Sequence, residues 1–165
     1  GIANDIGASL PAVEQPRYNM LDIHIELEIM ETTSYHGMGI TPWSPLQYGI
    51  LTGKYNDGKP EGSRLQLNDR FDDSLNEETL SKVRDLTKMA GEMEITMAQL
   101  ALAWILRRPE ISSVITGATK IEQIESNVMA SEINLSKDDL EKIDEILQNK
   151  PEFHGPYKPA LPDRS

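Results

Sequence analysis

Three short apolar runs alternate along the chain with longer segments in which apolar residues recur at helical spacing. The runs cover Val13 to Tyr18, Met38 to Trp43 and Ile111 to Thr116, and each lies between Pro, Gly or Asn residues. Short apolar runs bounded in this way are typical of strands buried on both faces, as in a parallel sheet. We therefore expect three largely buried parallel strands.

In the segments between and after these runs, apolar residues recur every three or four positions, which predicts amphipathic helices. Thr119 followed by Glu122 predicts a capping box at the fourth helix, and Ser136 with Asp139 a weaker one before the fifth. Strand and helix alternate, so we expect an α/β fold with parallel strands and outer helices. Three strands cannot close a barrel, so the chain looks like part of a larger structure. The predicted helices cover Asp22 to Ser34, Glu77 to Gly91, Thr96 to Arg108, Ile121 to Ala130 and Ser136 to Leu147.

The composition is that of one soluble globular domain. Of the 165 residues, 38% are apolar and 26% are charged, which is too apolar for a disordered chain. Only Pro151 to Ser165, with four prolines, reads as a tail without regular structure. We therefore expect residues 1–150 to form the folded part and 151–165 a proline-rich tail.

The charge and the cysteine count narrow the function classes. A net charge of −11 disfavours binding to nucleic acid or anionic lipid, since such binding depends on Lys and Arg. The sequence has no cysteine, no secretory leader pattern and no apolar stretch near the roughly 20 residues of a membrane span. We expect a cytoplasmic protein with no membrane insertion.

One candidate anion site lies after the third apolar run, where Thr119 begins a predicted helix. Free N–H groups and the positive end of the dipole make such a helix start attractive to anions. Gln123 and Asn127 are four residues apart, so both amides lie on one face of that helix. An ordinary cap with two solvated amides is the open alternative.

A second candidate is the loop that follows the second run. Trp43 at the end of a strand can stack on a flat ring, and Gly49 and Gly53 allow the backbone to approach a phosphate closely. Lys54 and Arg64 add positive charge. The open alternative is a core tryptophan beside a surface loop.

Other chemistry has no support in the sequence. His24, His36 and His154 lack the spacing of a metal site. The sequence contains no glycine-rich fingerprint of the Rossmann or Walker type and no Ser/His/Asp triad pattern.

Five motifs in order closely resemble the aldo-keto reductases, especially the branch that contains potassium-channel beta-subunits and bacterial reductases. Their order and most of their spacings match across nearly the whole chain. The motifs are Gln15 to Leu21, Trp43 to Leu46 with Gly53 to Tyr55, Gly62 to Arg64, Gln99 to Leu106, and Val114 to Ala118 with Gln123 and Asn127.

The resemblance implies that residues 1–150 are the C-terminal half of a TIM-type (β/α)8 barrel that binds NADPH without a Rossmann motif. It implies reduction of aldehydes and ketones, small carbonyl substrates, by hydride transfer. Gln15 would contact the nicotinamide carboxamide and Trp43 would stack on the nicotinamide ring. The loop after Trp43 would cover the pyrophosphate and the 2′-phosphate side, and the turn and helix after the third run would contact the adenosine. The implied cofactor-binding residues are Asn4, Gln15, Trp43, Ser44, Pro45, Leu46, Gly49, Lys54, Arg64, Gly117, Thr119, Gln123 and Asn127.

Two departures from the family limit this interpretation. The family's catalytic Asp, Tyr, Lys and His lie in the first half of its barrel, and no segment here matches that half, so no catalytic residue is assigned. Ala3 stands where a serine usually binds the carboxamide, and only eleven residues separate Asn4 from Gln15, where the family fits a whole helix. We therefore expect part of the family's sequence to be missing here.

Three functions stay open at this point. The chain could supply the cofactor-binding half of an NADPH-dependent reductase. It could belong to a non-catalytic NADPH-binding regulatory subunit, or it could be an inactive truncated remnant. The substrate, the preference for NADPH over NADH and the oligomeric state, a homo-oligomer included, also stay open.

Overall fold

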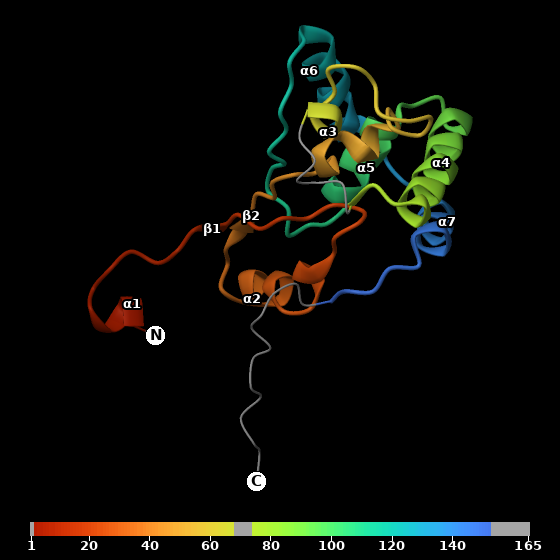
Figure 1. Ribbon diagram of the computed structural model, residues 1–165. Coiled ribbons are helices and arrows are strands. Elements are labelled where there is room, and N and C mark those ends of the chain that lie inside the picture. The colour runs from red at the N-terminus through yellow and green to blue at the C-terminus, as the bar shows by residue number, and fades with distance from the viewer. Residues whose placement is uncertain (1, 68–73, 153–165) are drawn as a thin grey trace.

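The three predicted strand segments lie side by side and parallel in the computed structural model, which describes residues 2–67 and 74–152 (Figure 1). Strand β1 pairs with β2 in the register Val13↔Gly39, and single bridges join Arg17 to Trp43 and Ile40 to Ile111. The order is therefore β1, β2 and then the segment 110–116. The elements are α1 (Ile2–Asp5), β1 (Val13–Glu14), η1 (His24–Glu26), α2 (Ile29–Tyr35), β2 (Gly39–Ile40), η2 (Gln47–Thr52), α3 (Arg64–Leu67), α4 (Glu77–Glu92), α5 (Met97–Leu106), α6 (Ile121–Val128), η4 (Met129–Glu132) and α7 (Lys137–Leu147).

The parallel arrangement is confirmed, but the prediction that the strands are largely buried along all six residues of each run is wrong. β1 and β2 have two residues each, and the third segment pairs through one bridge. Val13 is 50% exposed and Ile115 is 43% exposed. Within the described residues, neither β1 nor the segment 110–116 has a partner on its outer side. A strand that pairs on one edge only leaves the N–H and C=O groups of its other edge without strand partners.

The core forms around the predicted helices of the second half of the chain. Figure 1 shows α4, α5 and α7 together on one side of the molecule. α5 is apolar on all sides, and Leu100, Ala101 and Ile105 on it are inaccessible to solvent. A helix of this kind needs neighbours all round, and α4, α6, η2 and η4 contact it. The predictions for α4 and α5 are confirmed.

Two predicted helix starts have different outcomes. Ser136 and Asp139 form the predicted capping box before α7, since each side chain bonds the other residue's backbone N–H. The Thr119–Glu122 box is wrong, because Lys120 occupies the N-cap position with an extended backbone. The third residue of α6 is therefore Gln123, and its Oε1 accepts from the Thr119 N–H at 2.8 Å.

The predicted helix from Asp22 to Ser34 is divided in two. The 3-10 turn η1 ends at Glu26, and α2 begins at Ile29. The break falls at Glu28, whose φ of −143° is not helical. No helix in the described part of the chain is long and apolar enough to cross a membrane.

Candidate functional site

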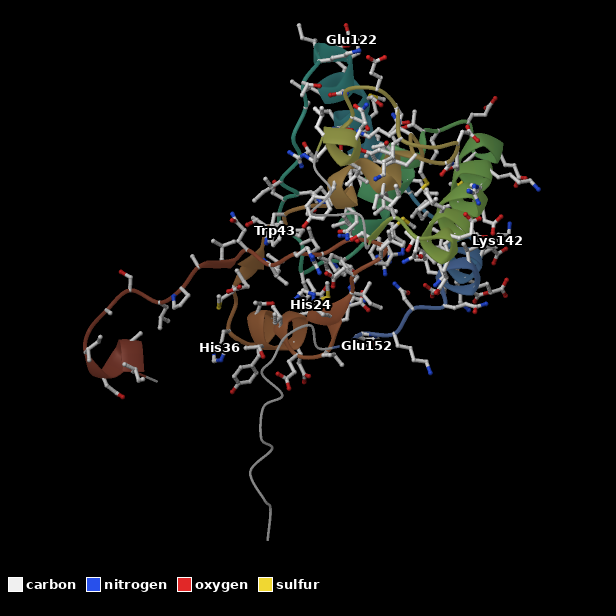
Figure 2. The ribbon with its side chains drawn as sticks, viewed as in Figure 1. His24, His36, Trp43, Glu122, Lys142 and Glu152 are labelled. Atoms are coloured by element: carbon white, nitrogen blue, oxygen red, sulfur yellow. The ribbon has the colours of Figure 1, made fainter. Side chains whose placement is uncertain are left out.

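The carboxyl ends of parallel strands meet at one edge of a sheet, and loops at that edge commonly form binding sites. At this edge the segment that ends in Trp43 lies between the first strand segment and the segment 110–116. Its backbone N–H donates to the Pro16 carbonyl at 3.0 Å, and the Ile115 N–H donates to the Pro42 carbonyl at 3.0 Å. Gln15 and Trp43 therefore emerge from neighbouring segments, and Gly117 follows on the other side. Trp43 is 41% exposed and lies beside β2 (Figure 2).

The exposure of Trp43 argues against its interpretation as a core residue. A core tryptophan would be buried, as Trp104 is at 2% exposure. Trp43 instead presents much of its ring to solvent at the strand ends. An exposed ring at this place is available to stack on a flat ligand.

The loop of residues 44–54, hereafter the 44–54 loop, has an unusual backbone. Ser44, Gln47 and Tyr48 have φ values of 55°, 42° and 57°, in the left-handed region that non-glycine residues rarely adopt. The loop is closed by hydrogen bonds from Gly49 and Leu51 N–H groups to the Leu46 carbonyl, at 2.8 and 3.2 Å. The backbone directly after Trp43 therefore forms a compact, hydrogen-bonded turn.

Two side chains anchor this loop and one lies across it. Pro45 is buried and Leu46 packs against the core. A Cβ added to Gly49 would stand 2.7 Å from Cε and 2.8 Å from Nζ of Lys54. Only glycine therefore leaves room for Lys54 to cross the loop in this way, and the Lys54 ammonium lies 5.0 Å from the centre of the Tyr55 ring.

A hydrogen bond connects the start of α3, where Arg64 lies, to Tyr55 directly after the 44–54 loop. Arg64 is the first residue of α3, and the next N–H, of Leu65, donates to the Tyr55 hydroxyl at 3.3 Å. Tyr55 itself is inaccessible to solvent. Lys54 and Arg64 are both exposed. Each is next in sequence to a residue of the Leu65–Tyr55 hydrogen bond, so both cations face solvent close to this bond.

The start of α6 forms the third part of the site. Thr119 donates to Gln123 Oε1 from its backbone at 2.8 Å and from its hydroxyl at 3.4 Å. The Gln99 side chain donates to the Ser126 carbonyl at 3.0 Å and fastens α6 to α5. Gly117, Thr119 and Gln123 are exposed and Asn127, one turn further on, is half-buried.

Asn4 does not join the other candidates. It lies in α1, at the end of an extended segment away from the rest of the chain (Figure 1). Gly1 to Asn4 resemble a strand end of the family, but the backbone over residues 2–5 is helical, and the Ile6 N–H donates to the Ile2 carbonyl at 3.1 Å. No strand among the described residues pairs with this segment, so it satisfies its backbone groups locally.

A buried carboxylate beside the strand ends was missed by sequence reasoning. Asp22 is 3% exposed and accepts hydrogen bonds from Arg17 and from His24 Nδ1, the latter at 2.7 Å. Burial raises the pKa of the Asp22 carboxyl, but the bond to His24 and the charge of Arg17 outweigh burial and hold this pKa below its ordinary value.

Asn19 was missed as well. It is inaccessible to solvent and bonds both Ser44 and Gln47 of the 44–54 loop. A single polar residue after an apolar run carries no periodic signal, so the sequence could not have singled it out.

The described ranges contain no cluster of three His, Cys, Asp or Glu side chains able to hold a metal ion. His154 and the rest of the tail from residue 153 lie outside the described residues.

Comparison with known proteins decides the family. The model of the Aldo/keto reductase family matches residues 5–148. The chain belongs to the aldo/keto reductase family.

This aldo/keto reductase chain is similar both to channel subunits and to a reductase. It is 42% identical to a probable voltage-gated potassium channel subunit beta of Arabidopsis thaliana, over 96% of this chain and 50% of the relative. It is 44% identical to a putative voltage-gated potassium channel subunit beta of Schizosaccharomyces pombe, over 91% of this chain and 46% of the relative. It is 35% identical to an L-glyceraldehyde 3-phosphate reductase of Escherichia coli O157:H7, over 82% of this chain and 41% of the relative. The chain thus spans about half the length of the curated relatives it matches.

Proposed function

We propose that this chain is the cofactor-binding half of an NADPH-dependent aldo/keto reductase that reduces aldehyde or ketone carbonyls by hydride transfer. The observation that carries this conclusion is the exposed ring of Trp43 at the strand ends, followed by the 44–54 loop with Lys54 across Gly49. A flat ring surface next to a cation on a glycine-containing loop suits a ligand that joins an aromatic ring to phosphates.

The fold proposed for residues 1–150 is the C-terminal half of a TIM-type (β/α)8 barrel, with 151–165 as its tail. One support is α6, where Ile121, Ile124 and Val128 are 71%, 56% and 63% exposed and lie on one face. A helix that follows a strand in a parallel array packs over that strand and its neighbour. Within the described residues no strand lies beyond the segment 110–116. A further strand there would pair with the free edge and cover this apolar face.

The residues present fit NADPH by their chemistry. Gln15 offers an exposed carboxamide on the segment that pairs with that of Trp43, suited to hydrogen bonding with the nicotinamide carboxamide. Lys54 and Arg64 supply the positive charge that phosphates need on a chain of net charge −11. Thr119, Gln123 and Asn127 present hydroxyl and amide groups for the adenosine end.

When bound, NADPH supplies the hydride; the part of this chain is to bind and orient. Stacking on Trp43 and hydrogen bonding to Gln15 would fix which face of the nicotinamide meets a carbonyl carbon, and orientation of this kind contributes much of the rate. No residue of this chain is assigned as the proton donor.

A fluorescence titration of the protein with NADPH tests the proposed function. We expect saturable binding that the substitution Trp43→Ala weakens by about tenfold or more, since one stacking partner is lost. Tyr35→Ala is the matched control, because Tyr35 is an aromatic residue 85% exposed on α2. Absence of NADPH binding, or binding that Trp43→Ala leaves unchanged, would overturn the assignment.

A second function is a non-catalytic NADPH-binding regulatory subunit. It is favoured by three relatives at 41–44% identity, which are described as probable or putative potassium channel beta subunits, against 35% for the reductase. Both functions require the same cofactor site. Turnover of an aldehyde by the protein with NADPH would support the reductase, and NADPH binding without turnover would support the regulatory subunit.

A further inference from the structure

We propose that Asn19 is a positioning residue that holds Trp43 and the 44–54 loop in the conformation that binds NADPH, an inference that rests on the proposed function. Asn19 lies just after the first strand segment and is inaccessible to solvent. It would act through the loop and need not touch the cofactor.

The hydrogen bonds of the Asn19 side chain serve two tasks. Its Nδ2 donates to the Ser44 carbonyl and to Gln47 Oε1, both at 3.0 Å, and so connects it to the loop. Its Oδ1 accepts from the Leu21 N–H at 2.9 Å, which fixes the orientation of the amide. A buried amide with satisfied partners has one defined position.

The loop needs such a support because its backbone is strained where Asn19 holds it. Ser44 and Gln47, the two loop residues that Asn19 bonds, both have left-handed φ values, 55° and 42°. Non-glycine residues keep this conformation only when surrounding contacts enforce it. Leu46 and Pro45 anchor the loop by packing, but hydrogen bonds set the direction of the Ser44 carbonyl.

The same short segment of chain holds Trp43 from both sides. The N–H of Trp43 donates to the Pro16 carbonyl at 3.0 Å, and the carbonyl of the next residue, Ser44, accepts from Asn19 at 3.0 Å. Residues 16 and 19 therefore fix the backbone before and after the indole. Loss of the Asn19 bond frees one of the two attachments and lets the ring turn.

The test uses Asn19→Asp, which keeps the side-chain shape and the acceptor for Leu21 but removes the Nδ2 donor. The matched control is Asn149→Asp, because Asn149 Nδ2 also donates to a backbone carbonyl, that of Met20, at 2.8 Å. The control removes the same kind of bond at Met20, the residue that follows Asn19, without touching the loop.

Two measurements separate positioning from general stability. The first is the NADPH dissociation constant, taken well below the melting temperature so that each variant is folded. The second is the fluorine spectrum of protein labelled with 5-fluorotryptophan, in which the two tryptophans give two signals that Trp43→Phe assigns. We expect Asn19→Asp to raise the NADPH dissociation constant about tenfold, because the 44–54 loop loses the Nδ2 donor. We also expect the Trp43 signal to shift more than the Trp104 signal. Asn149→Asp should change neither.

Several outcomes would overturn the inference. They are an unchanged Trp43 signal, a Trp104 shift as large as that of Trp43, or an affinity equal to that of the parent protein. If the parent binds no NADPH, the proposed function fails, and the Trp43 signal alone decides whether Asn19 positions the loop.

A second variant keeps the test decisive if Asn19→Asp does not fold. Gln47→Leu removes one acceptor of Asn19 from the loop side and leaves the Ser44 bond. We expect a smaller rise in the dissociation constant, about threefold, and a shift of the Trp43 signal in the same direction. No effect on either measurement would contradict the role of Asn19.

Discussion

The side chain of Lys54 lies directly across Gly49, so that a Cβ at position 49 would stand 2.8 Å from the Lys54 ammonium nitrogen. We expect Gly49→Ala to displace Lys54 and to strain a backbone with φ of 94°. NADPH affinity should fall about tenfold, equivalent to about 1.4 kcal/mol, in a fluorescence titration.

Gly58→Ala provides the control for this substitution. Gly58 also has a positive φ, 127°, but nothing lies within 4 Å of an added Cβ. Backbone strain alone should leave the NADPH affinity unchanged. Equal losses in the two variants would show that the crossing of Lys54 over Gly49 does not matter.

The two tryptophans should separate binding from stability. Trp104 is 2% exposed and lies 5.3 Å from the Tyr18 ring, and the Arg107 guanidinium stacks on it at 3.7 Å. Trp104→Ala should lower the free energy of unfolding by about 3–5 kcal/mol. Trp43→Ala should cost under about 1 kcal/mol in the same urea titration, because the ring is already 41% exposed. A large loss on Trp43→Ala would mean that Trp43 is a core residue.

The sequence predicted the helices well where local signals are strong. The amphipathic pattern of α4 and the Ser136–Asp139 box of α7 depend on residues three or four apart, and both are found. The strands were predicted too long and too buried, because strand length depends on pairing with segments that the local pattern cannot reveal. Val13 and Ile115 are apolar enough for a covered sheet, yet lie at outer edges with nothing described beside them.

Some features of the candidate site could likewise be predicted from local sequence patterns, and others depend on tertiary packing. The strand pattern places Trp43 at the end of its segment, but the sequence left open whether its ring is buried, because exposure depends on tertiary packing. The role of Gln15 was implied only by the family resemblance. The Thr119 cap is displaced by one residue, since Lys120 adopts the extended backbone. Asn19 and Asp22 have partners fixed by tertiary packing, so no pattern along the chain marks them.

Acid should weaken the fold through Asp22. Its carboxyl has a folded pKa below the ordinary value of 3.8, because the His24 bond and the Arg17 charge outweigh burial. The resulting stabilisation is fully present above pH 3.8 and is lost as the pH falls through the lower folded pKa. Asp22→Asn should lower stability by about 2 kcal/mol at pH 7, and the gap to the parent protein should narrow below pH 4.

Denaturant unfolding between pH 2.5 and 7 checks this expectation. Asp85→Asn, at an exposed position on α4, is the control and should give a curve parallel to that of the parent. A gap between Asp22→Asn and the parent that stays constant with pH would contradict a depressed pKa at Asp22.

Loss of the α7 cap should have a moderate effect. Ser136→Ala removes the acceptor for the Asp139 N–H at 3.2 Å and should reduce stability by about 1 kcal/mol. Ser81→Ala, at an exposed position within α4, should change stability by less than about 0.5 kcal/mol. Thermal melts of both variants give the comparison, and equal melting temperatures would contradict a stabilising cap.

The apolar face of α6 should tolerate charge in this chain. Ile124 is 56% exposed and α6 has no buried residue. Ile124→Lys should therefore change the free energy of unfolding by less than about 0.5 kcal/mol and reduce binding of an apolar dye. Ile143→Lys is the contrasting variant, because Ile143 on α7 is inaccessible to solvent and should not accept a charge. Similar destabilisation by both would mean that the α6 face is already covered.

The strained backbone after Trp43 also has a consequence for how the molecule fluctuates. Left-handed geometry at Ser44, Gln47 and Tyr48 costs about 1–3 kcal/mol for each residue, so brief local opening of this stretch relieves more strain than opening of α5. Amide protons of residues 47–53 should accordingly exchange with solvent sooner than those of α5. A molecule held by Trp43 and Lys54 would slow that exchange, so the rate of amide exchange in one short loop would report occupancy of the site without any chemical turnover.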